Sequence, residues 1–139
     1  MRLMVQYALL AMVLVLAWRR GGMPERAAAG ILIGALLVDR AFHAAFRESI
    51  FHQVDLWHLF LDAAMLAGFF LLALYADRKW PMWMAALQVI STTAHVLRAI
   101  RPDMLDVIYP ILARGPYYGQ LIILLIVMSI SPNLRSKAR

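Results

Sequence analysis

Long apolar runs alternate with short polar connections along this chain. The clearest run extends from Leu56 to Ala76, between Asp55 and the polar segment 77–81. As an α-helix, a run of this length extends roughly 30 Å, which matches the hydrocarbon core of a bilayer. Other apolar runs repeat the pattern. The sequence therefore predicts an all-α integral membrane helical bundle of four to five transmembrane helices, with spans at about 3–18, 27–46, 56–76, 82–100 and 116–130.

The connections between these runs outline a single transmembrane domain over residues 1–139. The segment Arg19–Arg26, RRGGMPER, is broken by Gly and Pro and predicts a tight turn. The segment Arg101–Gly115 is mixed in character, which is typical of either a short interfacial helix or a re-entrant piece. The last span begins at Pro116 or extends back toward Tyr109 through a proline kink. If this last region is not a true span, the bundle has four helices.

Composition supports a membrane protein and excludes several kinds of site. Of the 139 residues, 63% are hydrophobic, and the mean hydropathy is +0.71, whereas soluble domains are about half apolar. The net charge of +6 comes mostly from basic residues at the ends of apolar runs, where they meet anionic lipid headgroups. The absence of cysteine excludes disulfides and thiolate ligands. The lipid bilayer is the expected partner, and nucleic acid is not.

The distribution of basic residues predicts the orientation of the chain. Cytoplasmic connections of membrane proteins carry an excess of Lys and Arg. With the N-terminus outside, the cytoplasmic side receives the larger basic set, namely Arg19, Arg20, Arg26, Arg78, Lys79, Arg135, Lys137 and Arg139. We therefore expect a multi-pass protein with its N-terminus outside and its C-terminus in the cytoplasm.

One segment resembles a group of bacterial proteins. The segment Tyr75–Ile100 is similar to small uncharacterised inner-membrane proteins of alphaproteobacteria. The shared pattern is a basic residue, then Trp-Pro-x-Trp, then Gln and His on the following helix, represented here by Arg78, Trp80, Pro81, Trp83, Gln88 and His95. The resemblance implies a location in a bacterial inner membrane. It implies no activity and no catalytic residue.

Acids and histidines within the spans mark the candidate site, because charged groups inside a membrane are costly and face the bundle interior. Asp39 and His43 lie one helical turn apart in the second span, as do His58 and Asp62 in the third, and His95 belongs to the fourth. Successive spans run in opposite directions, so the helical rise of about 1.5 Å per residue places all of them at similar depths. We expect these residues to form one polar layer.

The chemistry of this layer has two interpretations. As a binding site, its imidazole and carboxylate groups suit a metal ion, a haem or a proton relay. As a structural layer, Asp62 pairs with Arg40, and Asp39 pairs with Arg98 or His43, which holds the helices together. The structural interpretation is favoured because the spacing lacks a strong metal signature such as HExxH. The expected state is therefore free of cofactor, with haem or a metal ion as the alternative.

The leading functional hypothesis is a small non-enzymatic accessory or scaffold subunit. The sequence has no soluble domain, and no nucleophile–base pair or phosphate loop stands out, so no catalytic residue is assigned. Gly30 and Gly34 form a small-residue pair that lets another helix approach, from this chain, another copy or another membrane protein. The alternatives are a metal- or haem-binding protein that uses the His/Asp layer, and an ion- or proton-conducting or pore-forming oligomer.

Overall fold

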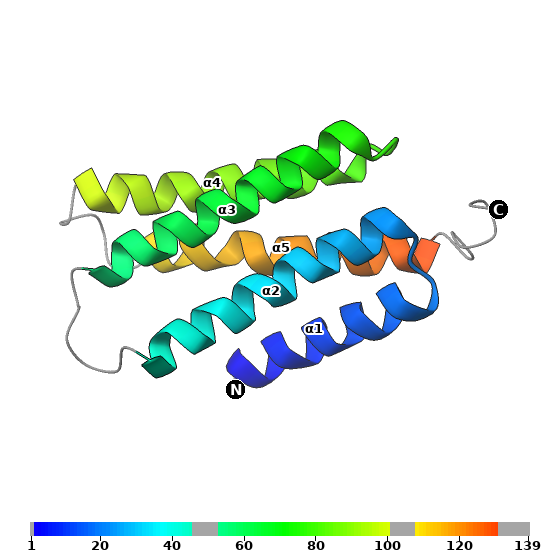
Figure 1. The fold of residues 1–139 in the computed structure, drawn as a ribbon, viewed down its shortest axis with the longest axis horizontal. Helices are drawn as coiled ribbons and strands as arrows, with labels where there is room; N and C mark the ends of the chain where they lie inside the picture. Colours follow the sequence, from blue (N-terminus) through cyan, green and yellow to red (C-terminus); the bar gives the residue numbers. More distant parts are fainter. Residues whose placement is uncertain (1, 46–52, 101–107, 131–139) are drawn as a thin grey trace.

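A computed structural model describes residues 2–45, 53–100 and 108–130 of the chain. Within these ranges the fold is all-α, as the hydropathy pattern predicted. The described helices are α1 (Arg2–Arg19), α2 (Met23–Ala45), α3 (Gln53–Tyr75), α4 (Trp80–Ile100) and α5 (Ile108–Ile130). They lie side by side in one bundle (Figure 1).

The turn between α1 and α2 is shorter than predicted. Helix α2 begins at Met23, so the second half of the predicted turn is already helical. Pro24 falls in the first helical turn, where the missing N–H removes no intrahelical bond. Glu25 Oε2 accepts a hydrogen bond from the Gly22 N–H at 2.9 Å, which satisfies a donor that the helix start leaves without a partner.

Helix α5 is longer than the predicted last span. It begins at Ile108 and contains Pro116 inside the helix, which agrees with the alternative in which the last helix extends back toward Tyr109. Residues 108–115 are the first turns of α5 rather than a separate short helix, and the point at which the membrane span begins stays a prediction. Residues 101–107 and the basic tail, 131–139, lie outside the described residues.

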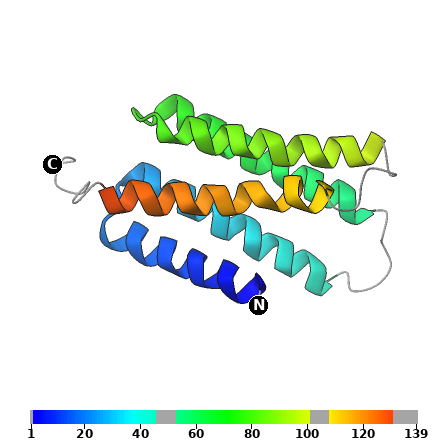
Figure 2. The ribbon, with the colours of Figure 1, turned by 180° about the vertical axis from the view of Figure 1, so that it is seen from behind.

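The helices form a closed ring rather than an open row. Each helix contacts the next in the chain where the two are described, and α5 packs back against α1. Figure 2 shows α5 lying between α4 and α1. The most extensive packing is that of α4 against α3 on one side and against α5 on the other. Because consecutive helices are antiparallel, the turns α1–α2 and α3–α4 lie at one end of the bundle, and the candidate site lies at the other.

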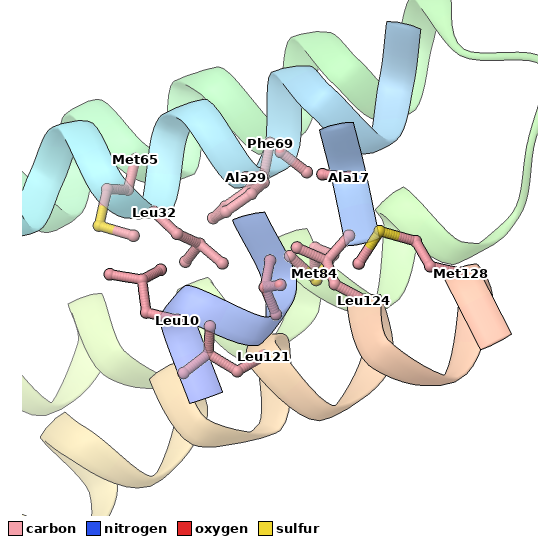
Figure 3. Close-up of a cluster of buried hydrophobic side chains, with 12 residues drawn as sticks. Leu10, Ala17, Ala29, Leu32, Met65, Phe69, Met84, Leu121, Leu124 and Met128 are labelled. Carbon is pink, nitrogen blue, oxygen red and sulfur yellow. The ribbon is translucent and has the colours of Figure 1, made fainter. Parts of the chain in front are cut away.

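Buried apolar side chains from every helix meet inside the ring (Figure 3). The fully buried members include Val13, Leu32, Phe69, Met84 and Leu124. Methionines fill irregular gaps between the helices, which is a common use of this flexible side chain. The core therefore joins the five helices in one domain.

The outer surface of the bundle is strongly apolar. Phe60 is 67% exposed, Leu74 64% and Ile111 63%, and a water-soluble surface rarely carries such side chains in continuous patches. Three helices, namely α2, α3 over Leu56–Tyr75 and α5, are long and apolar enough to cross a membrane, and α1 contains a shorter apolar helix, Met4–Arg19. The fold is that of a membrane helical bundle.

Helix α4 was predicted as a span but is less apolar than its neighbours. It carries a polar stripe of Gln88, Ser91, Thr92, His95 and Arg98. Much of this stripe faces α3 and α5 rather than the surface, since Gln88, Ser91 and His95 are buried. The interior position of these groups explains how α4 belongs to the bundle despite its lower hydropathy.

The predicted glycine pair does not pack within this chain. A Cβ atom built at Gly30 or Gly34 meets nothing within 4 Å, so the intramolecular form of that prediction was wrong for the described residues. The close approaches occur at Gly68, where a Cβ would lie 3.1 Å from Ile31, and at Gly119, where it would lie 3.0 Å from Leu87. Contact of the Gly30/Gly34 face with a partner stays a prediction.

Candidate metal centre

The candidate site residues gather at the end of the bundle opposite the two short turns. Helix α2 reaches this end with Asp39 and His43, and α4 reaches it with His95. Helix α3 starts there and contributes His58 and Asp62. The structure brings all of these predicted residues together at one end of the bundle, and within this polar layer they form two connected groups.

The first group consists of Asp39, His43 and His58 and is called here the Asp39 group. Asp39 Oδ1 lies 3.4 Å from His43 Nδ1 and 3.3 Å from His58 Nε2. One ligand atom from each of the three residues can be chosen so that all lie within 4.8 Å of one another. His43 Nδ1 also donates a hydrogen bond to the Asp39 backbone oxygen at 2.9 Å, so this nitrogen must release its proton in order to bind a metal ion. Two helices therefore present two imidazoles and a carboxylate to one point.

The separations in the Asp39 group match those between ligands of one metal ion. Metal bonds of 2.0–2.1 Å in tetrahedral geometry place neighbouring ligand atoms about 3.3 Å apart. Asp39 Oδ1 lies at that distance from both nitrogens, yet this buried oxygen has no hydrogen-bond partner. Buried polar atoms normally have a partner. A cation between the three side chains would supply it.

Aromatic side chains form one wall of the Asp39 group. Phe42 stacks on Trp57 with ring centroids 4.1 Å apart and an interplanar angle of 8°. Phe42 also meets the His43 ring edge-on, at 5.9 Å and 77°. An apolar wall limits water access and strengthens the interaction of a cation with its ligands.

The second group, called here the His95 group, consists of Asp62, Ser91, His95 and Tyr109. His95 Nε2 lies 3.4 Å from Asp62 Oδ2, and His95 Nδ1 lies 2.8 Å from the Tyr109 hydroxyl. Ser91 Oγ is 2.6 Å from Asp62 Oδ2 and 2.9 Å from the Ala113 backbone oxygen. Because both nitrogens of His95 already face polar partners, this group is a hydrogen-bonded network across α3, α4 and α5 rather than part of the ligand set.

Stacked imidazole rings connect the two groups. The His58 and His95 rings are nearly parallel, with centroids 5.8 Å apart and an interplanar angle of 10°. The His43 ring approaches His58 from α2 at 5.5 Å and 44°. The three imidazoles predicted from the sequence therefore form a row, in which His58 is the middle ring.

Haem does not fit between the paired histidines. In a haem with two histidine ligands, the iron lies between two imidazole nitrogens, and the porphyrin separates the rings. Here the Asp39 carboxylate occupies that position, at 3.4 Å from His43 and 3.3 Å from His58. The geometry of these two rings favours a single small cation over a macrocycle.

The arginines expected to neutralise the acids each lie over a tyrosine ring. The Arg40 guanidinium lies 5.8 Å from the centre of the Tyr7 ring, and the Arg98 guanidinium lies 4.3 Å from the centre of the Tyr109 ring. Within the described residues, the carboxylates of Asp39 and Asp62 lie 3.3–3.4 Å from imidazole nitrogens. A guanidinium over an aromatic face is itself a favourable contact, so both cations have a partner.

Several polar residues of this region were missed by sequence reasoning. Gln120 on α5 is fully buried and donates to Gln88 Oε1 at 2.9 Å, and Gln88 donates to the Asp62 backbone oxygen at 3.3 Å. Ser91 lies four residues before His95, on the same face of α4, and that spacing could have identified it. Tyr109 and Gln120 lie on α5, and no pattern in the sequence connects them to α3 or α4.

No protein-family model, curated protein or solved structure matches this chain. Its helices and its apolar surface identify the fold as an all-α membrane bundle. The function that follows depends on the geometry of the side chains at the site end of the bundle.

Proposed function

We propose that this membrane protein binds one transition-metal ion through Asp39, His43 and His58. The observation that supports the proposal is the buried Asp39 Oδ1, which has no hydrogen-bond partner and lies 3.4 and 3.3 Å from two imidazole nitrogens. The ion would connect the C-terminal part of α2 to the start of α3, two helices whose own contact is less extensive than that between α3 and α4.

The donor set limits the kind of ion. Imidazole suits zinc, copper, iron and nickel, whereas magnesium and calcium prefer oxygen ligands. Two imidazoles and one carboxylate are a frequent zinc set, and three protein ligands leave one tetrahedral position for water or another ligand. Zn²⁺ is therefore the first ion to test, with Co²⁺ as its spectroscopic substitute.

The test is metal binding by the detergent-extracted protein. After treatment with a chelator, Zn²⁺ should bind with a stoichiometry of one, and a concentration of 100 times Kd should raise the free energy of unfolding by about 2.7 kcal/mol. Asp39→Asn and His58→Gln each remove a ligand. We expect affinity losses larger than the roughly 10–100-fold typical of outer-shell changes, measured by competition with a chromophoric chelator.

A matched control separates ligand loss from charge loss. Asp77 is an exposed carboxylate in the α3–α4 turn, at the opposite end of the bundle, and Asp77→Asn should leave zinc affinity unchanged. Zinc binding that is absent in the wild-type protein, or equal in Asp39→Asn and Asp77→Asn, would falsify the proposed function.

The accessory-subunit role remains a second candidate. It is supported by the Gly30/Gly34 face of α2, where an added Cβ meets nothing within 4 Å, so a helix of another copy or another membrane protein has room to approach closely. The measurement is the mass of the assembly extracted in mild detergent, with and without a bulky residue at Gly34.

We also propose a bacterial inner membrane as the location, with the N-terminus outside. The support is the basic character of the end that holds the α1–α2 and α3–α4 turns, where Arg19, Arg20, Arg26, Arg78 and Lys79 lie. In this orientation those turns face the cytoplasm, and the proposed metal centre lies near the outer surface.

A further inference from the structure

His95 is held in one orientation by contacts from two other helices. Its Nδ1 lies 2.8 Å from the Tyr109 hydroxyl on α5, and its Nε2 lies 3.4 Å from Asp62 Oδ2 on α3. A neutral ring with its proton on Nε2 suits both neighbours, because the tyrosine O–H donates and the carboxylate accepts. The side chain is only 8% exposed. The ring therefore has little freedom to rotate.

The partners of His95 are themselves fixed. Asp62 Oδ2 is also in contact with Ser91 Oγ at 2.6 Å, and the Tyr109 ring meets the His95 ring edge-on at 5.5 Å and 87°. The Arg98 guanidinium covers the same tyrosine ring at 4.3 Å from its centre. Networks of this kind rigidify the groups that they include.

The flat face of this fixed ring lies against His58. The two rings are nearly parallel, at a centroid separation of 5.8 Å and an angle of 10°, which is an offset-stacked arrangement within the favourable range for aromatic pairs. His58 is more exposed than His95, and its Nε2 faces Asp39 Oδ1. A rotation of the His58 ring would break the stack and move Nε2 away from Asp39.

We propose that His95 is a positioning residue that orients the His58 ring for metal binding, and that Tyr109 and Asp62 hold His95 in place. This inference rests on the proposed function, because it concerns the same Asp39 group. His95 therefore supports the metal site without binding the metal ion itself. Outer-shell groups that orient ligating histidines are a regular part of metal centres.

The experiment compares two tyrosine variants on one helix. Tyr109→Phe removes the hydroxyl that contacts His95 Nδ1 while keeping the ring. Tyr118→Phe is the matched control, because Tyr118 also lies on α5 and contacts the ring of Tyr117 rather than the site. For Tyr109→Phe we expect about a 10-fold loss of zinc affinity and a shifted d–d absorption band of the Co²⁺-loaded protein. For Tyr118→Phe we expect neither.

A second variant and a second measurement separate positioning from stability. His95→Gln keeps polar atoms near Tyr109 and Asp62 but removes the flat ring, so it should shift the Co²⁺ band in the same way. The melting temperature of each metal-free variant shows how much packing is lost. An unchanged Co²⁺ band in Tyr109→Phe and His95→Gln overturns the positioning role, even if the melting temperature falls, and leaves the proposed function standing. A wild-type protein that binds neither zinc nor cobalt overturns both.

Discussion

At the scale of single residues, the unusual feature is the position of two buried carboxylate oxygens that have no hydrogen-bond partner. Among the described residues, buried carboxylate oxygens without a hydrogen bond occur at Asp39 and at Glu25. They lie at opposite ends of α2. The Asp39 oxygen faces two imidazoles, whereas Glu25 Oε1 lies 3.8 Å from Arg78 Nε. The arrangement at Asp39 suits a bound cation, whereas the Arg78 guanidinium is already a cation beside Glu25.

Glu25 joins the two short turns at the basic end of the bundle. The residue is fully buried, its Oε2 accepts from the Gly22 N–H at 2.9 Å, and its other oxygen faces Arg78 of the α3–α4 turn. A buried acid that loses its charge leaves the opposite cation without compensation. Sequence reasoning missed this pair because Glu25 was assigned to the tight turn predicted over residues 19–26, and no pattern there connects it to Arg78.

Glu25→Gln should therefore lower the stability of the bundle without affecting the Asp39 group. We expect a loss of about 1–3 kcal/mol in the free energy of unfolding, since hydrogen bonds and ion contacts of charged groups contribute in this range. Thermal or denaturant unfolding in detergent measures it, with zinc affinity as a second readout. Equal stability of Glu25→Gln and of the exposed-site variant Asp77→Asn would show that the Arg78 contact contributes nothing.

At the scale of the helices, glycine positions distinguish interior faces from outer faces. Gly68 and Gly119 allow α3 to approach Ile31 on α2, and α5 to approach Leu87 on α4. At Gly30 and Gly34 an added Cβ atom would meet nothing within 4 Å. The small-residue spacing in the sequence identified a packing face, but the spacing alone does not say whether the chain itself covers that face.

Leucine substitutions should separate these two kinds of glycine. Gly119→Leu forces a bulky group against Leu87, and overpacking of this kind costs about 1–3 kcal/mol. Gly34→Leu has open space, so its stability should equal or slightly exceed that of the wild type. If the Gly30/Gly34 face binds a partner helix, Gly34→Leu should instead reduce the mass of the detergent-extracted assembly. An unchanged mass would assign this face to lipid.

At the scale of the whole molecule, the ring of helices gives the bundle two chemically different ends. One end holds the basic turns and the Glu25–Arg78 contact. The other holds the Asp39 and His95 groups. The surface between them is apolar, with Phe70 58% exposed and Met82 62% exposed, as expected where lipid chains surround the protein.

The predicted orientation can be tested with introduced cysteines, because the chain has none. With the N-terminus outside, a cysteine at Gly22 faces the cytoplasm, and a cysteine at Ser49, in the connection between the second and third spans, faces outward. An impermeant thiol reagent applied to intact cells should label Ser49→Cys and spare Gly22→Cys. Permeabilised cells provide the control, in which both should react. The opposite pattern of labelling in intact cells would invert the topology.

The sequence by itself determined the class of the fold and most of the helix positions. Hydrophobic runs of bilayer length must form helices, because a backbone in lipid has no water to satisfy its polar groups. The same runs made Asp39, His43, His58, Asp62 and His95 conspicuous, and helical rise alone placed them at similar depths. Helix boundaries followed less directly from the pattern. Pro24 was assigned to a turn and Pro116 to a helix start, whereas Pro24 lies in the first turn of α2 and Pro116 lies inside α5.

Only the tertiary structure decided how the polar residues are divided. Depth along a helix follows from residue number, but the rotation of each helix about its axis and its choice of neighbours depend on packing between elements far apart in the chain. That packing brings Tyr109 and Ser91 to His95, and turns Asp39 toward both His43 and His58. It also leaves open space beside Gly30 and Gly34 and buries Glu25. The division into the Asp39 group and the His95 group therefore belongs to the assembled bundle, because no local pattern in α2, α3, α4 or α5 specifies the partner on another helix.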